Sequence, residues 1–266
     1  MGRKKNKKNA LLWKIEGKTL PGYSYLFGTM HVKDQRAFTL MNDVYPKIDA
    51  CESFATEFNL EEMDLNFDLE LTGLENGQSL QDLIRPKNYH KIRKIFRKAT
   101  GLDIIHFDQT QPLIVANVIN ERILSKDMPV SLDMHLWNYA KVQEKITLGI
   151  ETFQEQINIL KKIPLDYQIK MLLAMGKNFK SHRKSIIKMT RQYEKADIRQ
   201  LYKSGLKSAG GLKHLLIYDR NILMAERIGR YIEEQTMFCA IGAGHLAGKY
   251  GVLRLLKKQG FKVKPV

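Results

Sequence analysis

Two histidines follow the same short motif near the two ends of the chain. The first motif is Gly28-Thr29-Met30-His31 and the second is Gly242-Ala243-Gly244-His245, and an apolar, strand-like run precedes each. In open α/β sheets, ligands bind in the crevice outside the carboxyl ends of the strands. We therefore expect both histidines to lie just beyond strand ends and to contribute to one active site.

Two acidic residues occupy similar positions in the middle of the chain. Glu57 lies near the end of one strand-like run, and Glu151 directly follows another. Two imidazoles and a carboxylate suit a divalent transition metal such as Mn, Co, Fe or Zn and leave a position for water. The sequence thus favours a metal site of His31, His245 and Glu57, where a bound water would be activated and the remaining acid would accept its proton.

The same residues have simpler interpretations. A single histidine often packs or caps a helix, and either glutamate could cap a helix or pair with a basic neighbour. The glycines of the second motif, together with Gly248, also resemble a dinucleotide-binding loop between a strand and a helix. That interpretation is disfavoured, because no further strand-helix units follow and lysines occupy the last strand, where an acid is expected.

The elements that must position these residues alternate between strands and helices. A hairpin followed by a helix and a third strand predicts a βαβ unit with parallel pairing. We predict α/β structure with a mixed, mainly parallel small central sheet and a large helical insertion. The sequence predicts strands at 11–16, 23–27, 50–58, 145–150, 236–241 and 261–266, and helices that include 38–48, 86–98, 112–124, 131–143, 153–160, 165–175, 177–193, 218–234 and 246–259.

Length and composition indicate one large domain. The chain has 266 residues, enough to bury a substantial core. We expect a disordered basic tail at 1–9 and a single domain at 10–266, with helical insertions at about 60–130 and 153–235. No apolar run is long enough for a transmembrane helix, and the basic N-terminus precedes too short an apolar stretch for a secretory signal. These features predict a cytoplasmic protein with no integral membrane segment, in which Cys51 and Cys239 are buried free thiols.

The formal charge of +16 is the strongest deviation in composition. Such a charge is typical of proteins that bind nucleic acid or an anionic membrane surface. The basic residues are spread along the chain, and neither an aromatic-interleaved RNA-binding motif nor a DNA-reading module accompanies them. We therefore expect solvated, lysine-rich helix faces and no specific nucleic-acid partner. The sequence does not indicate an oligomeric state.

Several ordered motifs together resemble the TraB/GumN family. That family is related to the TIKI metalloproteases and is similar in fold to erythromycin esterase and ChaN-like proteins. The matching stretches are Leu12-Trp13-Lys14-Ile15, Ser24 to His31, Leu132-Asp133, Gly149-Ile150-Glu151-Thr152, Arg220-Asn221, and Gly242 to Gly248 with the segment that continues to Val266.

The resemblance implies an α/β core with a helical insertion and an active centre built from two Gly-x-x-His motifs and an acid. For the TIKI branch it implies peptide cleavage that depends on a divalent metal such as Mn or Co. Carried onto this chain, the catalytic and metal-binding residues are His31, His245 and Glu57. Glu151 is a further candidate acid. Arg220 would hold a substrate carboxylate or stabilise an oxyanion, and the expected substrate-side residues are Asn221, Asp133, Gly28, Gly242 and Gly244.

Three hypotheses follow. The first is a metal-dependent, peptidase-like hydrolase whose cofactor is Mn, Co or Zn. The second is a metal-independent, esterase-like hydrolase in which His31 is the base and Glu57 orients water. The third is a non-enzymatic protein that binds and regulates a peptide. The expected partner is a peptide or a small ester or amide. The lack of a signal or anchor does not favour the substrates of the TIKI proteins, which are secreted or anchored.

Overall fold

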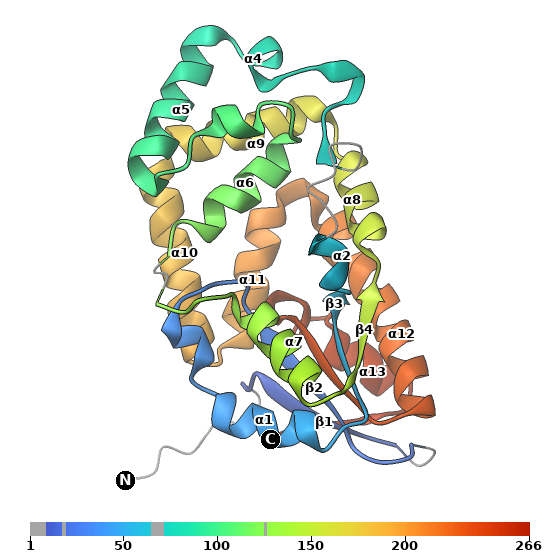
Figure 1. The fold of residues 1–266 in the computed structure, drawn as a ribbon. Helices are drawn as coiled ribbons and strands as arrows, with labels where there is room; N and C mark the ends of the chain where they lie inside the picture. The colour runs from blue at the N-terminus through green and yellow to red at the C-terminus, as the bar shows by residue number, and fades with distance from the viewer. Residues whose placement is uncertain (1–8, 18–19, 65–71, 125–126) are drawn as a thin grey trace. The chain divides into compact units, whose positions relative to one another are not determined.

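A six-stranded sheet forms the centre of the part that carries the predicted site. The computed structural model describes residues 9–17, 20–64, 72–124 and 127–266, so residues 1–8 of the predicted basic tail lie outside the described residues. The strand order is β4-β3-β5-β2-β1-β6 (Figure 1). The strands are β1 (Leu12–Glu16), β2 (Ser24–Thr29), β3 (Ser53–Phe58), β4 (Ile146–Glu151), β5 (Met237–Gly242) and β6 (Lys262–Pro265).

The sheet is mixed and mostly parallel, as the sequence predicts. β1 pairs antiparallel with β2 and with β6, which confirms the hairpin. The other pairings, β2 with β5, β5 with β3, and β3 with β4, are parallel. The two strands of the predicted βαβ unit, β2 and β3, are not neighbours, because β5 from the end of the chain lies between them.

The central strands are buried on both faces. Every residue of β2 is buried, and in β5 only the final glycine is partly exposed. Continuous burial is typical of parallel strands covered by helices, and it explains why these segments read as apolar runs rather than alternating ones. Phe54 of β3 and Phe238 of β5 stack across the pair with ring centroids 5.9 Å apart. Cys51 and Cys239 are buried free thiols, as predicted.

The sheet belongs to the first of two compact units. This unit comprises Met1–Leu60, Met128–Thr152 and Met189–Val266. Its helices are α1 (Met41–Asp49), α7 (Leu132–Val142), the end of α10 (Phe179–Glu194), α11 (Ile198–Ala209), α12 (Asp219–Glu234) and α13 (Val252–Lys258). Short 3-10 turns occur at η1 (Gln35–Phe38), η4 (Gly210–Leu212) and η6 (Ala243–His245), and a π-helical turn, η5 (His214–Tyr218), precedes α12.

The predicted helix 246–259 is wrong in its first part. α13 begins only at Val252. Gly248 has a φ of +94°, a left-handed conformation that glycine adopts without strain and that interrupts a right-handed helix. The resulting loop also differs from a dinucleotide-binding turn, in which a helix would start directly after the strand.

The second compact unit comprises Glu61–Asp127 and Phe153–Lys188. A core that includes Tyr89, Ile92, Phe96, Leu172 and Phe179 holds it together. Ser79 caps α4 through a reciprocal pair of contacts with Asp82. Its helices are α2 (Glu61–Asp64), α4 (Leu80–Leu83), α5 (Pro86–Thr100), α6 (Pro112–Glu121), α8 (Phe153–Lys161), α9 (Leu165–Lys177) and the start of α10, with 3-10 turns η2 (Glu75–Gly77) and η3 (Ile104–Phe107).

Within the described residues, none of the helices combines the length and the apolar character that crossing a bilayer requires.

Candidate active site

The carboxyl ends of four parallel strands bring the predicted residues to one edge of the sheet. Thr29 of the first motif pairs in register with Gly242 of the second, so the two motifs leave adjacent strands at the same level. On the other side of β5, β3 ends beside β4, and Phe58 pairs with Glu151. The two histidine motifs and the two glutamates therefore belong to the same edge.

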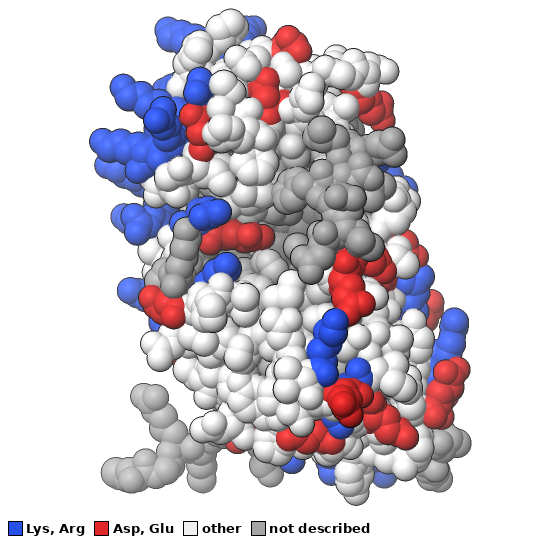
Figure 2. Space-filling view, in the orientation of Figure 1, with Lys and Arg blue, Asp and Glu red and all other residues white. Residues whose placement is uncertain are grey.

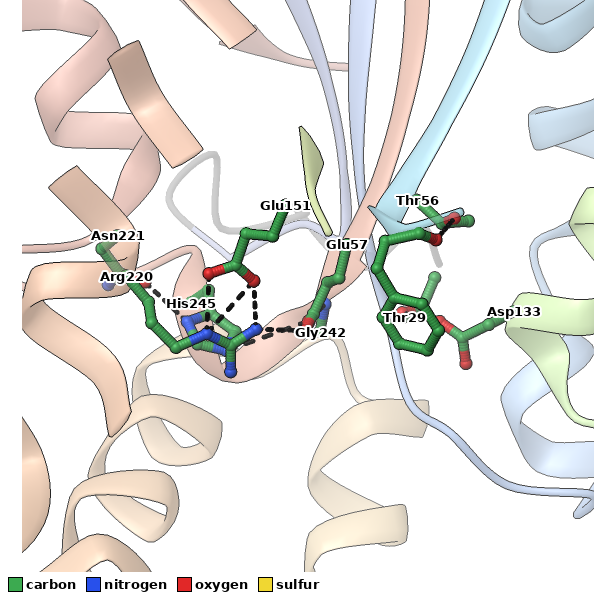
Figure 3. A network of polar contacts seen from close by, with 10 residues as sticks. Thr29, Thr56, Glu57, Asp133, Glu151, Arg220, Asn221, Gly242 and His245 are labelled. Atoms are coloured by element: carbon green, nitrogen blue, oxygen red, sulfur yellow. Dashed lines mark hydrogen bonds and ion pairs between the residues drawn. The ribbon is translucent and has the colours of Figure 1, made fainter. Parts of the chain in front are cut away.

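Arg220, in the first turn of α12, connects the two glutamates. Its guanidinium donates to both carboxylate oxygens of Glu151, with a shortest distance of 2.5 Å, and to Oε2 of Glu57 at 2.8 Å. Figure 3 shows the guanidinium between the two carboxylates. The Glu151 side chain is fully buried, and that of Arg220 is 14% exposed. A buried cation shared by two carboxylates compensates their charge and holds both in place.

Glu57 is held as an ionised carboxylate. Burial on its own would raise its pKa, but the charge of Arg220, the His245 ring and the Gly242 N–H lower the pKa to about 2. The Gly242 N–H donates to Oε1 at 2.8 Å. A Cβ at position 242 would lie 3.0 Å from that same oxygen and 3.5 Å from the His245 ring. This glycine therefore leaves room beside the glutamate and the histidine.

His245 is held by Asn221, the residue that follows the arginine on α12. The fully buried Asn221 side chain donates through Nδ2 to the Tyr250 carbonyl at 2.7 Å, so its oxygen faces His245 Nδ1 at 2.6 Å. Nδ1 must then carry the ring proton, which leaves the lone pair on Nε2. Burial lowers the pKa of His245 to about 4, with Glu57 opposing and Arg220 adding to the shift, so the ring is neutral at pH 7.

The Nε2 atom of His245 lies 3.8 Å from Oε1 of Glu57. That separation is too long for a direct hydrogen bond, but a single water could contact both atoms. A neutral imidazole lone pair and an ionised carboxylate beside it form an arrangement suited to accepting a proton from water.

His31 belongs to a different group of contacts. Its side chain is 48% exposed, and Nδ1 lies 3.3 Å from Oδ2 of Asp133 on α7. The Thr29 hydroxyl donates to Oδ1 of the same carboxylate at 2.5 Å. Figure 3 draws Thr29 and Asp133 on the opposite side of Glu57 from Arg220. The structure thus pairs His31 with Asp133.

The remaining predicted residues, Gly28 and Gly244, differ in their surroundings. The Gly28 N–H donates to the Leu11 carbonyl, and its own carbonyl accepts from the buried Tyr193 hydroxyl at 2.7 Å. A Cβ on Gly28 would lie 2.5 Å from the Leu246 side chain, whereas one on Gly244 would meet nothing within 4 Å. Gly28 therefore serves packing beneath the site.

Sequence reasoning missed Thr29 and Tyr193 as members of this network. Thr29 lies inside the first motif, so its position was a usable indication. Nothing in the local sequence marks Tyr193, because its contact with Gly28 depends on how α10 packs.

The fold and this edge define a class: an α/β protein with a carboxylate–imidazole pair at the carboxyl ends of its parallel strands. Its sequence matches the TraB/PrgY/gumN family over residues 11–265. The chain belongs to that family, as its motifs predicted.

Comparison with characterised proteins finds distant relatives among metalloproteases. The chain is 24% identical over 327 residues to metalloprotease TIKI2 of Danio rerio, covering 96% of this chain and 61% of the relative. It is 23% identical over 322 residues to metalloprotease TIKI1 of the same species, covering 96% and 63%. Human metalloprotease TIKI1 is 24% identical over 318 residues, covering 96% and 62%. The chain thus spans under two thirds of these relatives' lengths, and no solved structure matches it.

The relatives' names raise the question of whether these side chains hold a metal. Among the residues that the structure describes, no three His, Cys, Asp or Glu side chains are arranged to hold one ion. The predicted set of His31, His245 and Glu57 is therefore not assembled. Both oxygens of Glu57 already accept hydrogen bonds, from Arg220 and from the Gly242 N–H. This donor set does not fit a metal held by three protein ligands.

Proposed function

We propose that this protein is a hydrolase of peptide or related acyl bonds in which Glu57 and His245 activate a water. The observation that carries the proposal is the 3.8 Å separation between an ionised carboxylate oxygen and the Nε2 atom of a neutral histidine. The distant similarity to proteins named metalloproteases supports a peptide as the substrate. Residence in the cytoplasm stays a prediction from the sequence.

The contacts around Glu57 and His245 suggest a role for each residue in the proposed hydrolysis. A water between Oε1 and Nε2 donates one hydrogen to each, and His245 takes the proton as the oxygen attacks the carbonyl carbon. Asn221 keeps the other ring proton on Nδ1, so the lone pair stays on the side of the water. Glu57 orients the water and stabilises the imidazolium that forms. In this scheme, Arg220 and Glu151 position Glu57 and do not touch the substrate.

His31 is the candidate acid for the departing group. Asp133 accepts from Nδ1, and this contact orients the ring. The ring is half-exposed and follows the strand next to the one that leads to His245. In the proposal, His31 gives its Nε2 proton to the amine or alcohol as the C–N or C–O bond of the tetrahedral intermediate breaks. Solvent then takes the proton from His245 and returns one to His31. This assignment makes His31 an acid, whereas the sequence alone favoured a metal ligand or a base.

Hydrolysis can be detected without knowing the natural substrate. A defined mixture of synthetic peptides is incubated with the protein in ¹⁸O-labelled water, and new carboxyl termini are identified by mass spectrometry. We expect termini that carry one ¹⁸O atom with the natural protein and none with the Glu57→Gln variant. Intact peptides, together with no hydrolysis of p-nitrophenyl esters above the buffer rate, would overturn the proposal and favour a protein that only binds peptides.

A further inference from the structure

One face of the second compact unit is strongly basic. Between Arg85 and Lys98 the chain has seven Lys or Arg residues and no acid, and between Lys177 and Lys188 it has five and no acid. We define the basic face as the exposed members of these two segments. They are Arg85, Lys87, Lys91, Lys94, Arg97 and Lys98 of α5 and its N-cap, and Lys177, Lys180, Arg183, Lys184 and Lys188 at the end of α9 and the start of α10.

The two segments lie side by side. Phe96 of α5 and Phe179 of α10 are in ring contact, with centroids 5.9 Å apart. Gly176, near the end of α9, packs against Ile92 and Phe96 of α5 closely enough that a Cβ would meet Ile92 at 2.5 Å. Figure 2 shows Lys and Arg side chains gathered at the upper left, where Figure 1 places α5 and the start of α10. On α5, His90 and four cations line a shallow concavity.

The charge of this face opposes the stability of its own helices. Acidic residues in the first turn would favour a helix, yet neither α5 nor α10 has one, and both begin with cations nearby. Among the ion pairs of the described residues, Asp103 compensates only Arg93 at 2.7 Å and, more weakly, Arg97 at 3.8 Å. Folding does not require this repulsive arrangement of cations, and an anionic partner would compensate it.

We propose that the basic face binds the surface of an anionic phospholipid membrane. The defined segments contain eight lysines and four arginines, counting Arg93. Lysine is a hydrated point charge suited to diffuse attraction, whereas recognition of individual phosphates and bases favours the planar arginine fork. The three Phe and Tyr residues of the two segments, Tyr89, Phe96 and Phe179, are all buried, so the face offers neither a Phe nor a Tyr ring to stack on bases. The face thus attracts negative charge and has no means of recognising a nucleotide sequence.

Vesicle binding tests this assignment. The whole protein is sedimented with phosphatidylcholine vesicles that contain either no phosphatidylglycerol or 30% phosphatidylglycerol (about 0.1 M salt, where screening is moderate). We expect binding only to the anionic vesicles. In the triple variant Lys91→Glu, Lys94→Glu, Lys98→Glu, affinity should fall at least about 100-fold, because each basic side chain near such a surface strengthens binding about five-fold.

A charge-matched control separates the face from the total charge. The variant Lys207→Glu, Lys258→Glu, Lys262→Glu changes the net charge equally at exposed positions outside the basic face, and it should keep at least a third of the wild-type affinity. Equal loss in both variants would contradict the proposal, since net charge alone would then explain binding. Tighter binding to duplex DNA than to the vesicles at the same salt, lost in the first variant, would replace the membrane with nucleic acid.

Discussion

At the residue scale, the site depends on which atom of each polar group is already engaged. Asn221 contacts the Tyr250 carbonyl through its amide nitrogen, and that contact decides which way its oxygen faces. The oxygen in turn decides which nitrogen of His245 keeps a proton. The contact with the Tyr250 carbonyl therefore sets, through Asn221, the protonation state of the proposed base.

The lowered pKa of His245 predicts a pH dependence of stability. Burial lowers this pKa from 6.5 to about 4, so between these pH values the unfolded state binds more protons than the folded state. Stability should therefore be fully present above pH 6.5 and decrease as pH falls toward 4, by on the order of 3 kcal/mol. Urea unfolding of the natural protein and of His245→Asn at pH 7, 5.5 and 4.5 measures it. Identical pH slopes for the two proteins would refute this origin.

The ion pairs of Arg220 predict a large effect of its removal. In Arg220→Met the buried Glu151 carboxylate and the Glu57 carboxylate lose their shared cation. We expect a loss of about 3 kcal/mol or more in the free energy of unfolding. Arg230→Met removes an exposed arginine from the same helix and should change it by less than about 0.5 kcal/mol. Similar losses in both variants, measured by urea denaturation, would show that the ion pairs of Arg220 contribute nothing specific to stability.

The donor arrangement also predicts the metal content of the purified protein. Because no three described donors converge, we expect substoichiometric Mn, Co and Zn by elemental analysis and a hydrolysis rate that a chelator does not change. Stoichiometric metal that disappears in both Glu57→Gln and His245→Asn would contradict water activation by the pair alone. It would instead support the three-ligand site that the sequence favoured.

At the element scale, the two histidine motifs are positioned by adjacent parallel strands and by tight packing between β2 and η6. The sequence predicted both strands and both motifs, since their apolar runs and glycines are local features. It did not predict that β5 separates β2 from β3, because strand order depends on contacts between segments about 180 residues apart. The sequence also placed the start of the last helix too early. An apolar pattern does not reveal the left-handed conformation of Gly248, which interrupts a helix at that position.

A pair of glycine substitutions tests this packing. In Gly28→Ala the new methyl group would meet Leu246 at 2.5 Å and Ala243 at 3.1 Å, so strand and turn must move apart. We expect a loss of about 1 to 3 kcal/mol in stability, as for other overpacked sites. Gly244→Ala, which adds a methyl group to open space in the second motif, should leave stability within about 0.5 kcal/mol. Thermal and urea unfolding compare the two, and equal tolerance would mean that Gly28 is not needed for packing.

At the scale of the whole molecule, the sequence predicted the fold class and the family, which depend on motifs spread over nearly the full length. The sequence also predicted that Glu57, Glu151 and His245 lie at one edge of the sheet. In the structure, Arg220 contacts both glutamates and the Gly242 N–H donates to Glu57. The sequence did not predict which polar residue contacts which. Asp133 and Asn221 were expected beside substrate, and that stays a prediction. The structure adds that Asp133 contacts His31 and Asn221 contacts His245, which only side-chain geometry reveals.

The central claim is that the Glu57–His245 pair performs the hydrolysis. The most direct measurement is the rate of peptide or ester hydrolysis by the natural protein, Glu57→Gln, His245→Asn and the control Arg230→Met, each confirmed to be folded by circular dichroism. We expect each variant of the pair to lose about 10²-fold or more in kcat, because it lacks a general base or its carboxylate partner, while the control keeps its rate. Folded variants of both residues that hydrolyse the probe as fast as the natural protein would contradict it.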